Sequence, residues 1–424
     1  MEEKSAEPEE DTDPTVEKVF RARTVYVLMK EDYRISRNIR ASWFFANLDT
    51  VLQFVPRQSL DNIEDELTVL SVIPHEDDVV DGCLPLNRKF KFQLQPESNI
   101  IFLAKRYRLA FVLDLSHSLA SVDLRTGEVL LNKVIPTLRR CLTGVVKPFI
   151  LPGTELLYEP ELYITVIAHT PLLKCTTNQV LTQGMCVHQG NVEEFLYMMK
   201  ERFDSFEQNL ASEFAKWQEQ KQNTVETPEE MSDGRYPHTD NVIPMNPEAG
   251  IINLLRQGFF ALQLLPENTS AGICVVTDGS VGVTDSNRFD SLMTQLRNST
   301  IACSFLKMGD TYCARAQFGH IPHIELLQFI STATFGAYFS SCPDLTSDDS
   351  KHPNVYHTAL LQWSFQRGLE GFRYDLTQGQ QKTAVHPTAL INRILAHPIK
   401  AGPSSVVYQI IRKRIFSPLY FVEF

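Results

Sequence analysis

The chain has 424 residues, of which 43% are hydrophobic and 21% charged, and its formal net charge is −11 at pH 7. This length provides two or three cores, and the composition is that of an ordinary globular protein. The acidic balance argues against a nucleic-acid backbone or an anionic membrane surface as the main partner. Eight acids against one lysine in residues 1–17 predict a disordered acidic tail.

Targeting signals and paired cysteines are both lacking in the sequence. The N-terminus is acidic without an apolar segment after it, and no apolar stretch reaches the ~20 residues that span a bilayer. The eight cysteines are scattered and form no CxxC pair. We therefore expect a reduced, cytoplasmic protein that meets membranes only indirectly, through partners.

Residues 18–104 predict a small unit of α/β or all-β type, which we assign as α/β. Residues 25–29 are apolar enough for a buried strand, and 38–55 have the spacing of an amphipathic helix. Strands are expected at 67–72 and at 88–94, where Phe90, Phe92 and Leu94 alternate with polar residues. Pro96 is expected to interrupt the second of these strands.

From residue 105 the pattern changes to apolar strands that alternate with amphipathic helices. Such alternation indicates βαβ units, and nearly continuous apolar strands indicate a sheet covered on both faces. We therefore expect an α/β fold over 105–342, a mostly parallel doubly wound sheet. The expected strands are 108–115, 162–170, 272–279 and 300–309, and the expected helices are 128–146, 251–265, 287–298 and 323–334.

A helical insertion and loop over 191–247 interrupt this alternation. In residues 191–218 apolar residues recur at spacings of three and four, which predicts a long amphipathic helix. Two interpretations stay open: the helix lies on its own sheet, or it offers this face to a partner. Residues 221–247 are polar and predict a loop, and 343–424 predict a linker and the incomplete start of a further domain.

Two of the predicted strands end in an aspartate. Asp114 follows the run RLAFVL, with Ser116 and Ser118 at alternate positions after it, and Asp278 follows GICVVT. Ligands of doubly wound sheets gather at the carboxyl ends of the strands, so these side chains are expected to converge. Carboxylates and hydroxyls suit Mg²⁺, which takes few protein ligands and retains water. We therefore predict a degenerate Mg²⁺ site at Asp114, Ser116, Ser118 and Asp278.

The residues 114-DLSHS-118 and 277-TDG-279, together with LLQFISTATFGAYF near the end of the segment, resemble the von Willebrand factor A domain over 105–342. The resemblance implies that fold and a metal-dependent adhesion site that begins with DxSxS. One departure concerns a threonine of that family, because alignment on IINLLRQGFFAL places Ala249 near its position. Two alternatives follow: a bound Mg²⁺ ion, or a metal-free remnant of the site and no cofactor.

Catalytic arrangements are weak in this sequence. Asp114, Ser116 and His117 are near neighbours along the chain, whereas a catalytic triad is defined by its geometry in space. Cys313, His320 and His323 lack a fourth zinc ligand at a standard spacing. Neither a Walker A lysine nor a GxGxxG motif is present. We expect a non-enzymatic protein, with a hydrolase based on Ser116 as the remote alternative.

A second resemblance concerns the N-terminal part. VYVLMKEDYRISRNIRASWFFANLDTVL, LTVLSVIP and RYRLAFVLDLSHSLASVDLRTGEV are similar to the start of the seizure-threshold-2 family of large KICSTOR scaffold subunits. The resemblance implies a fragment or isoform of such a scaffold, which helps recruit the GATOR-one complex to lysosomes. It implies negative regulation of target-of-rapamycin complex one when amino acids are scarce. The implied partners are KICSTOR and GATOR-one subunits, and the implied location is the cytoplasm and lysosomal surface, with the peroxisome as an alternative.

Overall fold

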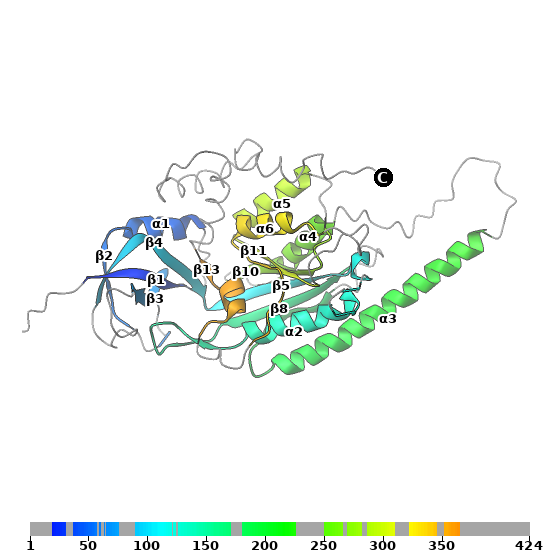
Figure 1. Cartoon of the computed structure of the whole chain (residues 1–424), viewed down its shortest axis with the longest axis horizontal. Helices are drawn as coiled ribbons and strands as arrows, with labels where there is room; N and C mark the ends of the chain where they lie inside the picture. Colours follow the sequence, from blue (N-terminus) through cyan, green and yellow to red (C-terminus); the bar gives the residue numbers. More distant parts are fainter. Residues whose placement is uncertain are drawn as a thin grey trace, which may run out of the picture.

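Two β-sheets lie next to each other along the long axis of the computed structural model, and helices cover them (Figure 1). The acidic tail predicted for 1–17, most of the loop predicted for 221–247, and residues 365–424 lie outside the described residues. The structure describes residues 19–30, 37–56, 59–60, 63, 65–75, 90–120, 122–123, 126–170, 180–225, 250–265, 269–281, 286–309, 322–345 and 352–364.

The first sheet forms an N-terminal unit in which β1 is the central strand. Its strand order is β13-β4-β1-β3, with β2 paired to β4, and β1 runs parallel to β4 and antiparallel to β3. Helix α1 packs on this sheet through the buried side chains of Ala41 and Phe44. The elements are β1 (Val19–Met29), α1 (Arg37–Asn47), β2 (Val51–Phe54), β3 (Leu67–Pro74), β4 (Phe90–Ala104) and β13 (Trp363–Ser364).

Two predictions about this unit were wrong. The helix expected over 38–55 ends at Asn47, and 51–54 form β2, because pairing with β4 outweighs helical spacing there. Strand β4 continues through Pro96 instead of ending before it. Its register with β1 shifts between the pairs Ala22–Leu94 and Thr24–Asn99, so the extra residues of β4 form a bulge that accommodates the proline.

The second sheet confirms the predicted α/β fold with a doubly wound, mostly parallel sheet. Its order is β12-β11-β10-β5-β8-β9, and each neighbouring pair is parallel except β8 and β9. The antiparallel edge strand β9 was not predicted, because VLTQGMCV is not a continuous apolar run. The strands are β5 (Arg106–Asp114), β8 (Glu161–His169), β9 (Val180–Val187), β10 (Ser270–Thr277), β11 (Ala302–Lys307) and β12 (Tyr338–Phe339).

Helices cover both faces of the second sheet. Along β5, Phe111 and Leu113 belong to the core that contains α2 and α3, whereas Ala110 and Val112 belong to the core that contains α4, α5 and α6. This alternation explains the continuous apolar sequence of β5. The first core continues into the N-terminal unit. The helices are η1 (His117–Ala120), η2 (Leu130–Lys133), α2 (Val134–Val145), α3 (Val192–Val225), α4 (Gly250–Gln263), α5 (Ser286–Asn298) and α6 (Ile324–Thr334).

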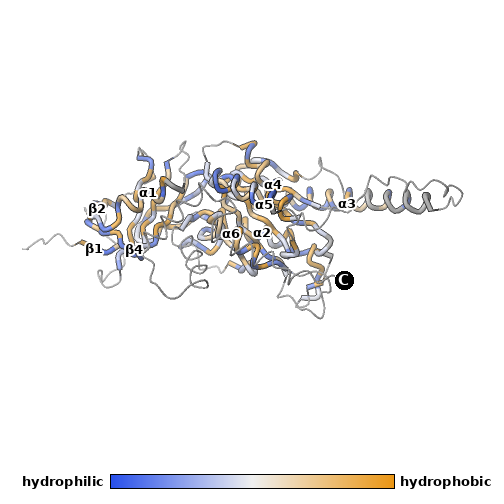
Figure 2. Tube along the Cα trace, turned by 90° about the horizontal axis from the view of Figure 1, so that it is seen from above, coloured by the Kyte–Doolittle hydropathy of each residue, from blue (hydrophilic) through white to orange (hydrophobic). Residues whose placement is uncertain are grey.

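The long amphipathic helix predicted over 191–218 is confirmed as α3, which extends to Val225. Its first half packs on β9 and α2 through Val192, Phe195, Met199 and Phe203, which are buried. Past this region the helix leaves the body of the molecule (Figures 1 and 2). The first half therefore lies on its own domain, while a partner for the second half remains a prediction. Within the described residues, we find no helix with the length and apolarity needed to cross a membrane.

Residues 352–364 return to the N-terminal unit, whereas the sequence analysis placed 343–424 in a linker and a further domain. They include a π-helical turn, η5 (His357–Leu361), and β13, which pairs with β4. Trp363 and Tyr356 are buried in the first core, so these 13 residues belong to the packing of the two sheets. A short hairpin, β6 (Phe149–Ile150) and β7 (Leu157–Tyr158), lies beside them.

Candidate functional site

The carboxyl edge of the second sheet, where β5, β8, β10 and β11 end, contains its topological switch point. Strands β5 and β10 are neighbours, but the chain continues from β5 to β8 on one side and from β10 to β11 on the other. The connections after these two strands therefore run in opposite directions across the sheet. Asp114 pairs in register with His169, and Thr277 pairs with Lys307. Buried polar residues thus form one row across four strands.

Asp114 is held by hydrogen bonds from both neighbouring segments. Its side chain is buried, at 3% exposure. Thr277 Oγ1 donates to Asp114 Oδ2 at 2.7 Å, and the backbone N–H of Ser116 donates to Oδ1 at 3.2 Å. The same Thr277 hydroxyl accepts from the backbone N–H of Gly279 at 3.0 Å. These hydrogen bonds therefore fix the orientation of the Asp114 carboxylate.

The two serines of DLSHS lie together after β5. Ser116 Oγ lies 2.9 Å from Ser118 Oγ, and Ser118 is buried while Ser116 is half-buried. The turn that contains them is closed by a backbone hydrogen bond from Leu119 N to Ser116 O. Both hydroxyls are thus close enough to contact one shared ligand. The alternate spacing of Ser116 and Ser118 after Asp114 is consistent with this proximity.

The second carboxylate, Asp278, follows β10 and has 6% exposure. Its Oδ1 accepts a hydrogen bond from the backbone N–H of Ser280 at 3.0 Å. Burial, and after it the negative charge of Asp278, raise the pKa of Asp114 to about 7, against the lowering effect of the Thr277 and Ser116 hydrogen bonds. The carboxyl edge therefore brings two acidic groups close together with little water to separate them.

His169 ends β8 beside Asp114. Its backbone carbonyl accepts a hydrogen bond from Leu115 N at 2.7 Å, and Gln257 Nε2 of α4 lies 3.3 Å from its Nδ1. Burial lowers the pKa of His169 to about 4, so the imidazole is neutral at physiological pH. It accordingly supplies no positive charge to offset the two carboxylates.

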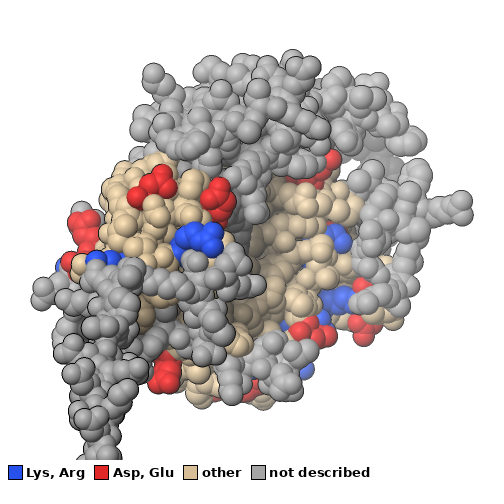
Figure 3. Space-filling view, turned by 60° about the vertical axis from the view of Figure 1, so that its left-hand side comes forward, with Lys and Arg blue, Asp and Glu red and all other residues tan. Residues whose placement is uncertain are grey.

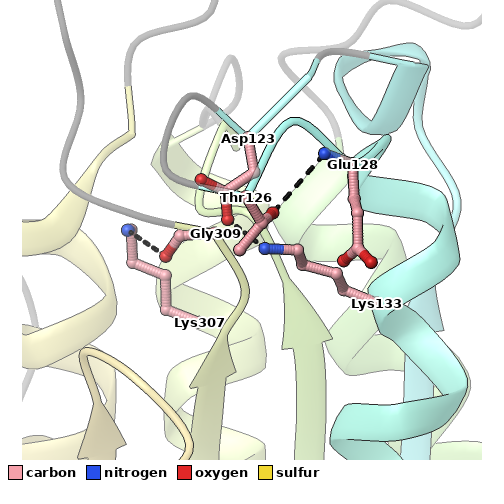
Figure 4. A network of polar contacts seen from close by, with 6 residues as sticks. All are labelled: Asp123, Thr126, Glu128, Lys133, Lys307 and Gly309. Carbon is pink, nitrogen blue, oxygen red and sulfur yellow. Dashed lines mark hydrogen bonds and ion pairs between the residues drawn. The ribbon is translucent and has the colours of Figure 1, made fainter.

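Two lysines lie nearby, and each has a partner of its own (Figure 4). Lys133 Nζ forms an ion pair with Asp123, which lies on the loop after β5 and is 3% exposed. Lys307 Nζ, at the end of β11, donates to the Gly309 carbonyl at 3.4 Å. The Asp123–Lys133 pair fixes the loop onto η2 and orders the chain that follows the two serines.

The donor chemistry of the carboxyl edge fits a hard divalent cation. Asp114 and Asp278 would supply carboxylate oxygens and Ser116 and Ser118 hydroxyl oxygens, the ligand types that Mg²⁺ takes alongside water. A cation there would also relieve the repulsion between the carboxylates. Among the residues that the structure describes, no group of three or more His, Cys, Asp or Glu side chains is arranged to hold a metal. Any ion would thus depend on the serine hydroxyls and on water.

All four predicted ligands are described, but Ala249, whose position was to supply a third hydroxyl, lies outside the described residues. The same is true of the His117 side chain, Cys313 and His320. Sequence reasoning missed Thr277, His169 and Gln257. Thr277 and His169 could have been found from the sequence, because Thr277 belongs to the TDG motif that located Asp278 and His169 ends an apolar run as Asp114 does.

No protein-family model matches the chain. Solved structures similar to it include the VWA domain of SpRpn10 (12% identity, 57% of this chain and 90% of that chain, TM-score 0.31). Others are an aerotolerance-related membrane protein from Bacteroides fragilis (12%, 57% and 94%, TM-score 0.29) and the manganese-loaded TRAP protein of Plasmodium vivax (11%, 63% and 79%, TM-score 0.29).

These likenesses are too distant to carry an argument about sites or function. The fold follows from the chain's own features: the strand order, the antiparallel edge strand, and the placement of DLSHS and TDG on adjacent strand ends at the switch point. The domain is von Willebrand A-like.

Proposed function

We propose that the chain is a non-enzymatic, protein-binding module whose ligand-facing region is the carboxyl edge of its von Willebrand A-like domain. The pair of buried carboxylates at the switch point, Asp114 and Asp278, is the observation that carries this proposal. The oxygens of these carboxylates are held in place by hydrogen bonds, so this edge can bind a polar group of a partner protein. The Ser116 hydroxyl contacts Ser118 Oγ, and this hydroxyl pair gives no support to the hydrolase alternative.

The alternative within this proposal is dependence on a divalent cation. In the Mg²⁺-dependent form, the four predicted ligands hold the ion and a partner carboxylate completes its coordination. In the metal-free form, the edge contacts its partner directly and the chain has no cofactor. The proximity of the two carboxylates favours the first form, whereas Ala249, at the aligned position of a threonine, favours the second.

Titration calorimetry with Mg²⁺ and Mn²⁺ distinguishes the two forms. The Mg²⁺-dependent form predicts saturable binding to the wild-type chain that is lost in Asp114→Ala and weakened in Ser116→Ala. The matched control is Asp204→Ala, which removes an exposed carboxylate from α3. Equal heats from the wild type, Asp114→Ala and Asp204→Ala would rule out this ion site and leave the metal-free form.

At a finer level we propose a scaffold role of the KICSTOR type. Its support is the resemblance of the N-terminal unit and of the following strand to the seizure-threshold-2 family, given above. In this role the chain contacts other KICSTOR subunits and the GATOR-one complex, and these partners bring it from the cytoplasm to the lysosomal surface. There it helps restrain target-of-rapamycin complex one when amino acids are scarce.

Affinity purification of the tagged chain from amino-acid-starved cells tests the scaffold role. Recovery of KICSTOR or GATOR-one subunits with the wild-type chain is the expected result, with the full-length scaffold purified in parallel as a positive control. If the full-length control recovers these subunits and the chain recovers none, this segment lacks the proposed role. Recovery that survives both chelator and Asp114→Ala would assign the contact to a surface other than the carboxyl edge.

A further inference from the structure

The two sheets are joined through a single residue. Strand β4 of the N-terminal unit ends at Ala104, and strand β5 of the von Willebrand A-like domain begins at Arg106, so only Lys105 lies between them. Both strands are fixed by pairing to their own sheets. A change in the angle between the sheets would therefore concentrate its backbone rotation at Lys105.

A buried hydrogen-bond network surrounds this connection. Ala104 N donates to Tyr107 Oη at 2.8 Å, and Tyr158 Oη donates to the Ala104 carbonyl. The Tyr107 hydroxyl in turn donates to the carbonyl of Leu361 at 2.8 Å. Both tyrosines are fully buried, so these hydrogen bonds do not compete with bulk water. The network thus links the connection between the sheets to a residue 254 positions from Tyr107 in sequence.

Leu361 belongs to residues 352–364, which we call the clasp. At one end the clasp is anchored on the von Willebrand A-like domain, where Asn354 Nδ2 donates to the Gly144 carbonyl of α2 at 2.9 Å. The ring of Tyr356 fills the space that a Cβ at position 144 would occupy. His357 packs on Phe149 of the β6–β7 hairpin, with ring centroids 4.5 Å apart.

The other end of the clasp is anchored on the N-terminal unit. Trp363 pairs in register with Phe102 of β4, and Ser364 Oγ donates to Asn99 Oδ1 at 2.8 Å. The Arg40 guanidinium of α1 lies 3.9 Å from the centroid of the Trp363 ring, a cation–π contact in a buried setting. Besides Lys105, the clasp is thus a connection that holds the two sheets together, next to the β6–β7 hairpin, whose Pro152 carbonyl accepts a hydrogen bond from Ser71 Oγ of β3.

We propose that the clasp is a latch that fixes the angle between the two sheets, and that its release lets the N-terminal unit pivot about Lys105. Strand β13 has two residues, so it contributes few ladder hydrogen bonds and is the element of this sheet that separates first. The N-terminal unit keeps its remaining strands when β13 leaves. A latched state and a pivoted state therefore share the same two sheets and differ in how the core that the two units share is packed between them.

Distances between one spin label on each sheet test the latch. The labelled chain carries Val51→Cys on β2 and Val180→Cys on β9, both at exposed positions, in a background of Cys83→Ser, Cys175→Ser, Cys186→Ser, Cys313→Ser and Cys342→Ser. In this background Asn354→Ala removes the anchor on α2, far from the label on β2, and Tyr107→Phe removes the hydroxyl that joins Leu361. Tyr163→Phe, on the opposite face of the second sheet, is the matched control.

A narrow distance distribution is expected for the wild type and for Tyr163→Phe, and a second population for Asn354→Ala and Tyr107→Phe. Each variant loses at least two buried hydrogen bonds, and at about fivefold for each bond the pivoted fraction should rise at least fivefold, with amide exchange in 99–104 quickened by the same factor. Unchanged distances and exchange in both clasp variants would overturn the proposal. If Asn354→Ala fails to fold, Tyr107→Phe, which keeps the ring, still decides between these outcomes.

Discussion

Thr277 Oγ1 lies 2.7 Å from Asp114 Oδ2, and this hydrogen bond joins the ends of two adjacent strands that are 163 residues apart in sequence. The hydroxyl both donates to the carboxylate and accepts from Gly279 N, so it supports the turn after β10 as well. A single side chain thereby aligns DLSHS with TDG. The shape of the carboxyl edge depends on this contact.

Replacing Thr277 by valine, which keeps the shape but removes the hydroxyl, should destabilise the chain by about 1–3 kcal/mol, because Gly279 N and Asp114 Oδ2 each lose the hydrogen bond to this hydroxyl. Denaturant unfolding at pH 7.5 measures the change. Thr294→Val on α5 is the control, since its hydroxyl donates to the Asp290 carbonyl at an exposed position. Equal losses for both variants would contradict a special role of Thr277.

Asp114 should make the metal-free chain less stable as pH rises from 3.8 to about 7. Its pKa in the folded state, about 7, is above the ordinary value of 3.8, so the folded state holds a proton that the unfolded state has lost. That contribution is complete below pH 3.8 and is lost as pH rises through 7, with a slope of up to about 1.4 kcal/mol per pH unit.

Urea unfolding in chelator from pH 5 to 7.5 measures this slope, taken as the difference between the wild type and Asp114→Asn so that the contribution of the buried histidines cancels. Asp278→Asn should reduce it by removing the neighbouring negative charge, although burial, the larger cause of the shift, remains. Saturating Mg²⁺ should abolish it if the ion binds, since the bound carboxylate stays ionised. A slope that is the same in the wild type and in Asp114→Asn would show that another group controls stability in this range.

Two buried histidines predict the opposite pH dependence below 6.5. Burial lowers the pKa of both His169 and His357 to about 4, so between pH 4 and 6.5 the unfolded state binds protons that the folded state excludes. Stability should therefore fall as pH drops through this window, by up to about 1.4 kcal/mol per pH unit for each histidine. In His169→Gln/His357→Gln the slope should flatten, and an unchanged slope would assign it to other groups.

Gly336 should not tolerate even one added methyl group. A Cβ at this position would overlap the backbone carbonyl of Cys303, and a strand cannot move aside as a side chain can. Gly336→Ala should cost about 3 kcal/mol or more, by separating β12 from β11 or shifting the end of α6. Gly250→Ala, with no atom within 4 Å of the added carbon, should change thermal stability little. Comparable melting temperatures for the two variants would refute this prediction.

The sequence was sufficient to predict the second sheet because its central strands are buried on both faces. RLAFVLDL and GICVVTDG therefore read as continuous apolar runs that end in a polar residue. The convergence of Asp114 and Asp278 followed from the rule that ligands gather at carboxyl ends of strands. Thr277 and His169 escaped notice because their roles depend on strand register, which no single strand's pattern reveals.

Elements that depend on long-range pairing could not be predicted in this way. Strand β9 has a glycine and polar residues and is fixed by pairing with β8, and β2 follows a helix directly and is fixed by pairing with β4. The return of Trp363 to β4 spans more than 260 residues. Local spacing contains no information about these partners.

The long helix α3 follows an antiparallel edge strand, so it runs in the same direction as β5 and β8. Its 34 residues measure about 51 Å, against about 27 Å for the eight residues of β9. The helix therefore extends past the same edge at which Asp114 and Asp278 lie. Charged side chains on the face shown in Figure 3 form small separate groups rather than one patch. A partner protein that docks at the carboxyl edge would also contact the side of α3. Binding at one of these two surfaces would raise the effective concentration of the partner at the other.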